Sequence, residues 1–344
     1  MEINQEDFQK IVEFMSLNSC FIDDNYIPKS IGDGQSNPTF LIKDINKKSI
    51  VIRTQPIGNL VRGAHRVDRE FLVLNALHKK KFEVPEPLAV CNTPELIGRM
   101  FYVMSFEEGD INFDPFLPNE NYEDKKKIYK SLAEVLGKLH GYSADSFGLP
   151  FKRNQGFMKR NLSLWYDQIF QHESVNDKEI EKIYNNILKE LPSDGPLSLL
   201  HGDYKLDNVV INEEKKCKAV LDWELSSFGE PLVDISFQII NWLIPSGILY
   251  GIGGNWEEKG LPSANKFLSW YEGAYKKEID INSLRNACIF SLIKLFCILK
   301  GIENRFNQGN AISKDAETKI LSAPAIKEVL MNSFETNPND IIVS

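Results

Sequence analysis

The first third of the chain carries short apolar runs separated by polar turns, a pattern that predicts a β-rich region. Residues 39–42 and 49–52 are two such runs on either side of a polar turn, which predicts a β-hairpin. Apolar residues then recur at helical spacing over 67–77, and the prolines that follow end this predicted helix. Residues 99–104 form a near-continuous apolar run, which predicts a buried strand.

A polar stretch at 107–110 follows this strand, and we interpret it as the boundary between two domains, 1–106 and 107–344. Beyond it the apolar periodicity is mostly helical. Helices are predicted over 128–141, 162–191, 234–243, 264–275, 282–305 and 324–332, with Pro324 suited to the first turn of the last helix. Three short apolar segments interrupt these helices and predict strands at 197–200, 209–211 and 218–221.

The composition narrows the class of protein. The chain has 344 residues, of which 42% are hydrophobic and 26% charged, as in an ordinary globular enzyme. Its net charge of −8 argues against nucleic-acid binding, which usually requires a basic surface. Five scattered cysteines without a CxxC pair disfavour a zinc site and a disulfide framework, and they fit a reducing cytoplasm. The acidic start is unlike a signal peptide, and the apolar stretch 287–299, which contains Lys294, is too short to span a membrane.

The candidate chemistry lies in two short motifs. Residues 201–208 read HGDYKLDN, and residues 221–224 read LDWE. An acid, an amide and a second acid in this order are typical of a magnesium-dependent phosphoryl transferase. Asp203 is the candidate base, because an Asp with an ordinary pKa can orient a hydroxyl and accept its proton late in the reaction. A lone loop Asp more often caps a turn, but the motif around this one favours catalysis.

Asn208 and Asp222 are the candidate metal ligands, because Mg²⁺ prefers oxygen donors and is usually held by one or two protein groups plus substrate phosphates. The alternative is that both side chains satisfy turn backbone groups. Lys205 is a candidate for offsetting charge on the γ-phosphate, or else an exposed loop lysine. His201 and Asp234 are expected to hold the loop rather than to touch substrate.

A second group of candidates could bind a nucleotide. Residues 32–37 read GDGQSN, and this glycine-containing loop could cover phosphates, although two glycines are usually only a turn. Arg53 ends the predicted hairpin and Glu70 lies on the following helix, the order of the cation and carboxylate that hold α- and β-phosphates in kinases. The candidate nucleotide-binding residues are Gly32, Gly34, Gln35, Ser36, Asn37, Arg53, Glu70 and Met104.

Taken in order, these motifs resemble the aminoglycoside phosphotransferase family, the small-molecule branch of the protein-kinase-like fold. Residues 201–208 match its H-G-D-x-x-x-x-N loop, 222–224 its D-W-E segment and 229–234 its G-x-P-x-x-D segment. The resemblance implies an α+β, two-lobed fold. Residues 1–106 would form a nucleotide-binding lobe with a five-stranded antiparallel sheet and one helix, and 107–344 a mainly helical catalytic and acceptor-binding lobe. It also implies transfer of phosphate from Mg-ATP to a small-molecule hydroxyl, with GTP as an alternative nucleotide.

A particular likeness is to the kinase-like domain fused to some acyl-CoA dehydrogenases, carried by residues 34–39, 53–58, 64–70 and 221–226. By this similarity, Arg53 replaces the usual strand lysine, and the acceptor is a hydroxyacyl thioester rather than an aminoglycoside. Basic residues near the expected cleft favour the phosphate-bearing thioester: Arg62, His65, Arg66 and Arg69. The alternatives are a kinase for an aminoglycoside or another amino alcohol, and a nucleotide-binding pseudokinase with a regulatory role. Acceptor contacts are expected in the second lobe around Trp242, Trp270, Tyr271 and Glu272.

Overall fold

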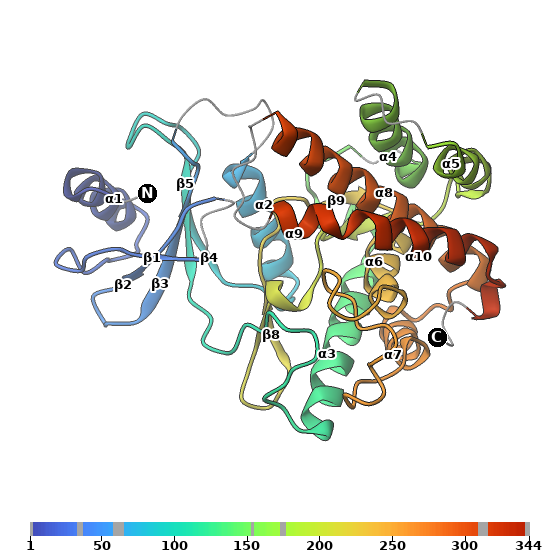
Figure 1. Ribbon diagram of the computed structural model, residues 1–344. Coiled ribbons are helices and arrows are strands. Elements are labelled where there is room, and N and C mark those ends of the chain that lie inside the picture. The colour runs from blue at the N-terminus through green and yellow to red at the C-terminus, as the bar shows by residue number, and fades with distance from the viewer. Residues whose placement is uncertain are drawn as a thin grey trace.

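The polypeptide folds into two lobes, one built on a β-sheet and one mainly helical (Figure 1). The structure is a computed structural model, and it describes residues 3–32, 37–57, 65–152, 155–172, 177–308 and 316–340. The predicted α+β, protein-kinase-like fold class is confirmed. The boundary between 106 and 107 stays a prediction.

The sheet has five antiparallel strands in the order β1-β2-β3-β5-β4. They are β1 (Lys29–Ile31), β2 (Thr39–Lys43), β3 (Ser49–Thr54), β4 (Pro87–Cys91) and β5 (Phe101–Ser105). The predicted hairpin is confirmed as β2 and β3, and the predicted strand at 99–104 as β5. In β3 the side chains alternate between two buried faces, because a helix covers each side of the sheet.

Helix α1 (Gln5–Leu17) covers one face of the sheet and was not predicted. Its buried residues Phe8, Ile11 and Met15 recur at helical spacing, but they are spread through an acidic, polar segment that hides the pattern. Asn4 caps the helix by accepting a hydrogen bond from the Asp7 amide at 2.8 Å. The sheet lobe therefore carries α1 in addition to the single helix that was predicted.

Helix α2 (Val67–Lys79) covers the other face and confirms the predicted helix at 67–77. Strand pairing places Val51 opposite Met104 and Arg53 opposite Tyr102. These four side chains therefore share the face that looks toward α2 and the helical lobe. Because side chains alternate between the two faces of the sheet along β3, the Arg53 side chain points toward the space between the lobes.

The helical lobe contains α3 (Tyr122–Gly141), α4 (Phe157–Tyr166), α5 (Lys178–Glu190), α6 (Leu232–Leu243), α7 (Ala264–Tyr275), α8 (Ile281–Asn307), α9 (Ala316–Leu321) and α10 (Ala323–Glu335). Five of the six predicted helices are confirmed, with Pro324 in the first turn of α10. The prediction of one helix over 162–191 is wrong. A π-helical segment (Asp167–His172) follows α4, and Asp177 starts α5 by accepting from the Ile180 amide at 3.2 Å. None of the helices described is both long and apolar enough to cross a membrane.

Two short antiparallel pairs of strands interrupt the helices, as predicted for 197–221. They are β6 (Ser198–Leu200) with β9 (Ser227–Gly229), and β7 (Val209–Ile211) with β8 (Cys217–Val220). Strand β9 was not predicted. The HGDYKLDN segment links β6 to β7, and residues 221–226 link β8 to β9. Because β6 pairs with β9 and β7 with β8, the HGDYKLDN and LDWE motifs lie on neighbouring loops.

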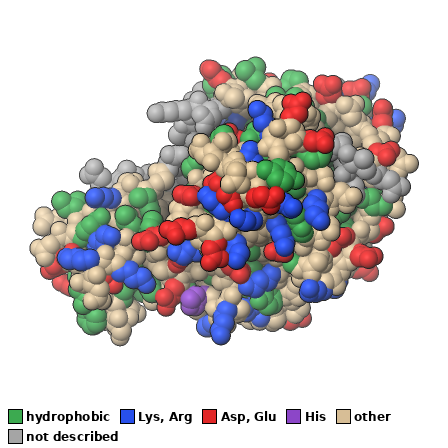
Figure 2. Space-filling model, turned by 90° about the horizontal axis from the view of Figure 1, so that it is seen from below, with side chains coloured by type: hydrophobic (Ala, Val, Ile, Leu, Met, Phe, Trp, Pro, Cys, Tyr) green, Lys and Arg blue, Asp and Glu red, His purple; other side chains and the backbone are tan. Residues whose placement is uncertain are grey.

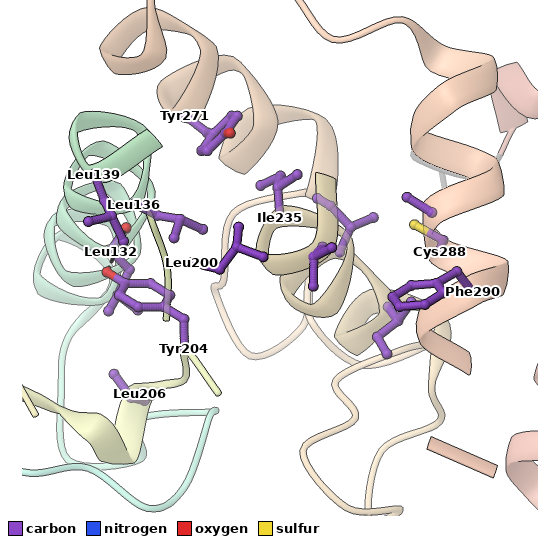
Figure 3. Close-up of a cluster of buried hydrophobic side chains, with 14 of the residues drawn as sticks. Leu132, Leu136, Leu139, Leu200, Tyr204, Leu206, Ile235, Tyr271, Cys288 and Phe290 are labelled. Atoms are coloured by element: carbon purple, nitrogen blue, oxygen red, sulfur yellow. Dashed lines mark hydrogen bonds between the residues drawn. The ribbon is translucent and has the colours of Figure 1, made fainter. Parts of the chain in front are cut away.

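A buried cluster fixes the HGDYKLDN segment in the helical lobe. Figure 3 shows Leu200, Tyr204 and Leu206 among apolar side chains that include those of α3 and α6. The Tyr204 hydroxyl donates to the Leu132 carbonyl at 2.9 Å, and the Gln238 amide donates to the Tyr204 carbonyl. The segment bends at residues 202–203 and ends in a short 3-10 helix, Leu206–Asn208. Tyr204 and Leu206 are buried, whereas the side chains of Asp203, Lys205 and Asp207 remain partly exposed.

Figure 2 shows the charged surface from below. On the described part of that face, acidic and basic side chains are interspersed rather than gathered by sign.

Candidate active site

Asp234 anchors the loop that carries the candidate base. Its carboxylate accepts hydrogen bonds from the backbone amides of His201 at 2.7 Å and Gly202 at 3.0 Å, and lies 3.3 Å from Nε2 of His140. Burial alone would raise the pKa of Asp234, but the hydrogen bond and charge of His140, with His201, hold it below the usual range. The loop is therefore held by a buried carboxylate, as expected from the sequence.

The motif requires its glycine. Gly202 has φ +86°, and a Cβ there would lie 2.7 Å from the Leu225 carbonyl oxygen. Only glycine adopts this left-handed conformation without strain while the two loops approach so closely. The imidazole of His201 donates from Nε2 to the Leu221 carbonyl at 2.8 Å, which joins the same two loops.

Asp203, Lys205 and Asn208 form one hydrogen-bonded group. The Asn208 amide donates to the Asp203 carbonyl at 2.9 Å and to its Oδ2 at 3.3 Å. Nζ of Lys205 lies 3.3 Å from Asp203 Oδ2 and 3.4 Å from Asp207 Oδ2. Burial raises the pKa of Asp203, and the positive charge of Lys205 opposes the shift. The structure therefore brings these three candidates together.

Asp222 lies beside this group on the adjoining loop. The backbone amide of Leu221 donates to the Asn208 carbonyl at 2.8 Å. Asp222 itself has φ +61°, an uncommon conformation for a residue other than glycine and one that often marks functional sites. Trp223 is buried behind it and donates from its indole to the Val220 carbonyl at 3.0 Å. The loop is thus held from behind while Asp222 borders the space between the lobes.

Arg53 connects the two lobes through carboxylates. Its Nε lies 3.1 Å from Glu70 Oε2, which is the predicted pairing, and its Nη2 donates to Asp222 Oδ1 at 2.6 Å. Burial lowers the pKa of Arg53, but the surrounding carboxylates outweigh this effect and raise it. Burial raises the pKa of Glu70 despite the adjacent guanidinium. The strand cation therefore bridges the sheet lobe to the loop that bears the candidate metal ligand.

Glu224 and Tyr250 also belong to this region and were not among the predicted residues. Burial, with the charge of Asp222, raises the pKa of Glu224 to about 7. Its Oε2 lies 4.0 Å from Arg53. The Tyr250 hydroxyl donates to Asp207 Oδ2 at 2.6 Å. Glu224 could have been found from its place two residues after Asp222, whereas Tyr250 lies in a segment without any motif.

Two cavities adjoin the group. One, of about 160 Å³, lies between the lobes and is lined by Arg53, Glu70, Met104 and Asp222 among others. The second, of about 480 Å³, lies within the helical lobe and includes Asp203. The candidate base and the candidate metal ligand thus border different cavities, with Asn208 between them in the hydrogen-bond network.

The glycine-containing loop is only partly described. Gly34, Gln35 and Ser36 lie outside the described residues, as does Arg62. Gly32 has φ +89°. The Asn37 amide lies 3.4 Å from Glu224 Oε2, so the end of this loop reaches the D-W-E segment.

The remaining basic candidates are engaged within the protein. Arg66 pairs with Asp68 at 2.6 Å. Arg69 donates to the Ser226 carbonyl at 2.9 Å and lies 4.0 Å from the centre of the Phe151 ring. These contacts place Arg69 between the lobes. Its guanidinium is occupied by protein groups there.

The expected acceptor residues are not at the cavity that contains Asp203. None of Trp242, Trp270, Tyr271 and Glu272 lines it. Tyr271 is fully buried, with its hydroxyl 2.8 Å from Nδ1 of His140, and Trp242 is also in the core. The structure therefore does not bring these four residues to the candidate base, and a role for them in acceptor binding stays a prediction. Aromatic residues on α4 and α6, Trp165 and Phe237, line the cavity instead.

Arg53→Lys is expected to lower the free energy of unfolding by about 1.5–3 kcal/mol, the contribution of one hydrogen bond to a charged group. A single ammonium cannot pair with both Glu70 and Asp222 through two fixed nitrogens, as the guanidinium does. Urea denaturation measures the change. The control is Arg66→Lys, whose exposed pair with Asp68 should contribute less than about 1 kcal/mol. Equal losses in the two variants would contradict a bridging role for Arg53.

Comparison with known proteins is consistent with this geometry. The family model described as "Phosphotransferase enzyme family" matches residues 28–254. Acyl-CoA dehydrogenase family member 11 of Rattus norvegicus is 36% identical over 82% of this chain and 37% of its own length. Acyl-CoA dehydrogenase family member 10 of Mus musculus is 31% identical over 83% of this chain and 27% of its own length. The chain thus spans only 37% and 27% of the lengths of these two relatives.

Solved structures share the fold. A protein of Ralstonia eutropha that is assigned to the aminoglycoside phosphotransferases has a TM-score of 0.83 and 26% identity, over 95% of this chain and 98% of that one. The aminoglycoside phosphotransferase APH(4)-Ia, solved with AMP-PNP and hygromycin B, has a TM-score of 0.61 and 11% identity, over 95% and 99% of the two chains. The family model covers the sheet, the HGDYKLDN loop and the D-W-E segment, and so the chain belongs to the phosphotransferase enzyme family.

Proposed function

We propose that this chain transfers the γ-phosphoryl group of Mg-ATP to a hydroxyl of a small molecule. The observation that carries the proposal is the hydrogen-bonded group of Asp203, Lys205 and Asn208, which sits between the two cavities. The cavity between the lobes would take the nucleotide, and the cavity in the helical lobe the acceptor. Residues 1–106 would thus form the nucleotide lobe and 107–344 the catalytic and acceptor lobe.

Asp203 would orient the acceptor hydroxyl and accept its proton. The Asn208 amide holds the Asp203 side chain through its nitrogen, so the carboxylate is positioned before the acceptor arrives. A pKa raised by burial makes this carboxylate a better proton acceptor than an ordinary Asp. Lys205, 3.3 Å from Asp203, would place its positive charge beside the transferring phosphate.

Asn208 and Asp222 fit a magnesium ion. With its amide nitrogen on Asp203, Asn208 keeps an oxygen that accepts no hydrogen bond from any residue described, and Asp222 adds a carboxylate. No three His, Cys, Asp or Glu side chains form a metal cluster in the described part, which suits an ion that takes its other ligands from phosphates and water. When bound, Mg²⁺ supplies positive charge to the transferring phosphate.

The nucleotide phosphates would also contact Arg53, which Glu70 holds in place, and the loop from Gly32 to Asn37. Met104 would contact the base or ribose from the wall of the same cavity. Nothing in these contacts selects ATP over GTP. We retain ATP as the nucleotide because fold relatives are solved with AMP-PNP.

A hydroxyacyl thioester is the acceptor that we favour. The relatives named acyl-CoA dehydrogenase point to acyl substrates, and the acceptor cavity has largely apolar walls. A polycationic aminoglycoside would instead require acidic walls. The pseudokinase alternative is disfavoured, because the candidate base and both candidate metal ligands are present.

The metal role is tested by Asp222→Asn. We expect the variant to need roughly 100-fold more Mg²⁺ for half-maximal ATP turnover, the upper range seen when a metal site is weakened. Metal removal with EDTA should abolish turnover in the wild type. Glu213→Gln, which removes an exposed carboxylate from the turn after β7, should keep the wild-type requirement. An unchanged requirement in Asp222→Asn would remove this residue from the metal site.

A further inference from the structure

Helix α8 contributes a lysine to the wall of the acceptor cavity. Residues 290, 291, 294, 295 and 298 of α8 recur at helical spacing, and all five line the cavity. Asp203 and Lys294 are the two charged side chains among the lining residues, and most of the others are apolar. A cation thus faces the same cavity as the candidate base.

Lys294 is half-buried and makes no ion pair or hydrogen bond with any residue that the structure describes. The centre of the Phe237 ring lies 6.0 Å from its Nζ. Burial lowers the pKa of Lys294, against the opposing charges of Asp234 and Asp203. A desolvated ammonium without hydrogen-bond acceptors is unfavourable, so this lysine gains from a ligand that supplies oxygen atoms.

We propose that Lys294 determines acceptor specificity by binding an oxygen of the acceptor's acyl group, either a thioester carbonyl or a carboxylate. The apolar chain would then lie against Trp165 and Phe237, with the hydroxyl at Asp203. The same ammonium would repel a polycationic acceptor. This inference rests on the proposed function, because it assigns the cavity beside Asp203 to the acceptor.

The test is the binding of two probes in the absence of nucleotide, measured by isothermal titration calorimetry. The probes are a hydroxyoctanoyl-CoA and the matching free hydroxyoctanoate. Lys294→Met should weaken binding of both by roughly 10- to 100-fold, the loss expected for one hydrogen bond to a charged group. Lys300→Met, on the same helix but paired with Glu303 outside the cavity, should bind as the wild type does. Wild-type affinity in Lys294→Met, or no binding of either probe to the wild type, would overturn the proposal.

Thermal unfolding without ligand separates recognition from a structural role. Lys294→Met should melt at the wild-type temperature or above it, because methionine replaces a desolvated cation with an apolar group of similar length. A lower melting temperature would assign Lys294 to stability and overturn the proposal.

The two proposals fail in different ways. If the wild type binds the acyl probes through Lys294 but transfers no phosphate, the kinase assignment fails and the role of Lys294 stands. If the wild type transfers phosphate and Lys294→Met keeps the wild-type KM for the acceptor, the role of Lys294 alone is wrong.

Discussion

Asp203→Asn is expected to lower kcat for phosphoryl transfer by roughly 10²- to 10⁴-fold, the range for loss of a general base. The amide keeps the shape and the contact with Asn208, but it cannot accept the proton of the acceptor hydroxyl. Binding of the nucleotide depends on the other cavity, so KM for ATP should change little. Steady-state kinetics with a saturating acceptor measure both constants.

Asp207→Asn is the matched comparison for this prediction. Both acids lie near Lys205, at 3.3 and 3.4 Å, but only Asp203 lines the acceptor cavity. Asp207→Asn should therefore cost far less in kcat than Asp203→Asn. Similar losses in both variants would mean that Asp203 acts through Lys205 rather than as the proton acceptor.

Asp234→Ala is expected to lower the free energy of unfolding by about 3–5 kcal/mol, the cost of breaking a buried charged pair. The variant would leave two backbone amides and His140 without their shared acceptor in the core. The candidate base should lose its position as well, so activity should fall with stability. Urea denaturation measures the first effect. Asp280→Ala, which removes the exposed cap of α8, should cost only about 1 kcal/mol.

The stability that Asp234 provides should depend on pH in a defined direction. Its pKa is lowered in the folded state, so the folded form binds fewer protons than the unfolded form near that pKa. The contribution is therefore complete above the unfolded pKa, about 3.9, and is lost as the pH falls through the lower folded value. The difference in the free energy of unfolding between the wild type and Asp234→Asn should become smaller as the pH falls below the unfolded pKa. If this difference stays constant as the solution is acidified, the Asp234 carboxylate is not ionised in the folded protein.

Regular elements with strong periodicity could be predicted from the sequence. The β2–β3 hairpin and helix α2 each present an apolar pattern that local chemistry enforces. The short β7–β8 hairpin likewise leads the HGDYKLDN and LDWE loops to adjoin, with the Leu221 amide donating to the Asn208 carbonyl. Helix α1 was missed because charged residues surround its three buried positions. The single helix predicted over 162–191 was wrong, because apolar residues at helical spacing on both α4 and α5 were joined across a mostly polar stretch between them.

Long-range contacts could not be predicted in the same way. The bridge from Arg53 to Asp222 joins residues far apart in the chain, and nothing local indicates it. Lys294 was visible only as a charge within an apolar stretch, and whether such a residue faces solvent, core or a cavity depends on how the helices pack. Tyr271 shows the reverse case: it was expected near the acceptor, but its side chain is buried in the core.

Product identity tests the central claim most directly. The wild-type chain is incubated with Mg-ATP and a hydroxyoctanoyl-CoA, and ³¹P NMR follows every phosphorus species. We predict a new phosphate-ester signal on the acceptor that grows in step with ADP, and no such signal when Mg²⁺ is withheld. ADP that appears with inorganic phosphate alone, or bound nucleotide that is never turned over, would contradict the assignment of this site as a hydroxyl kinase.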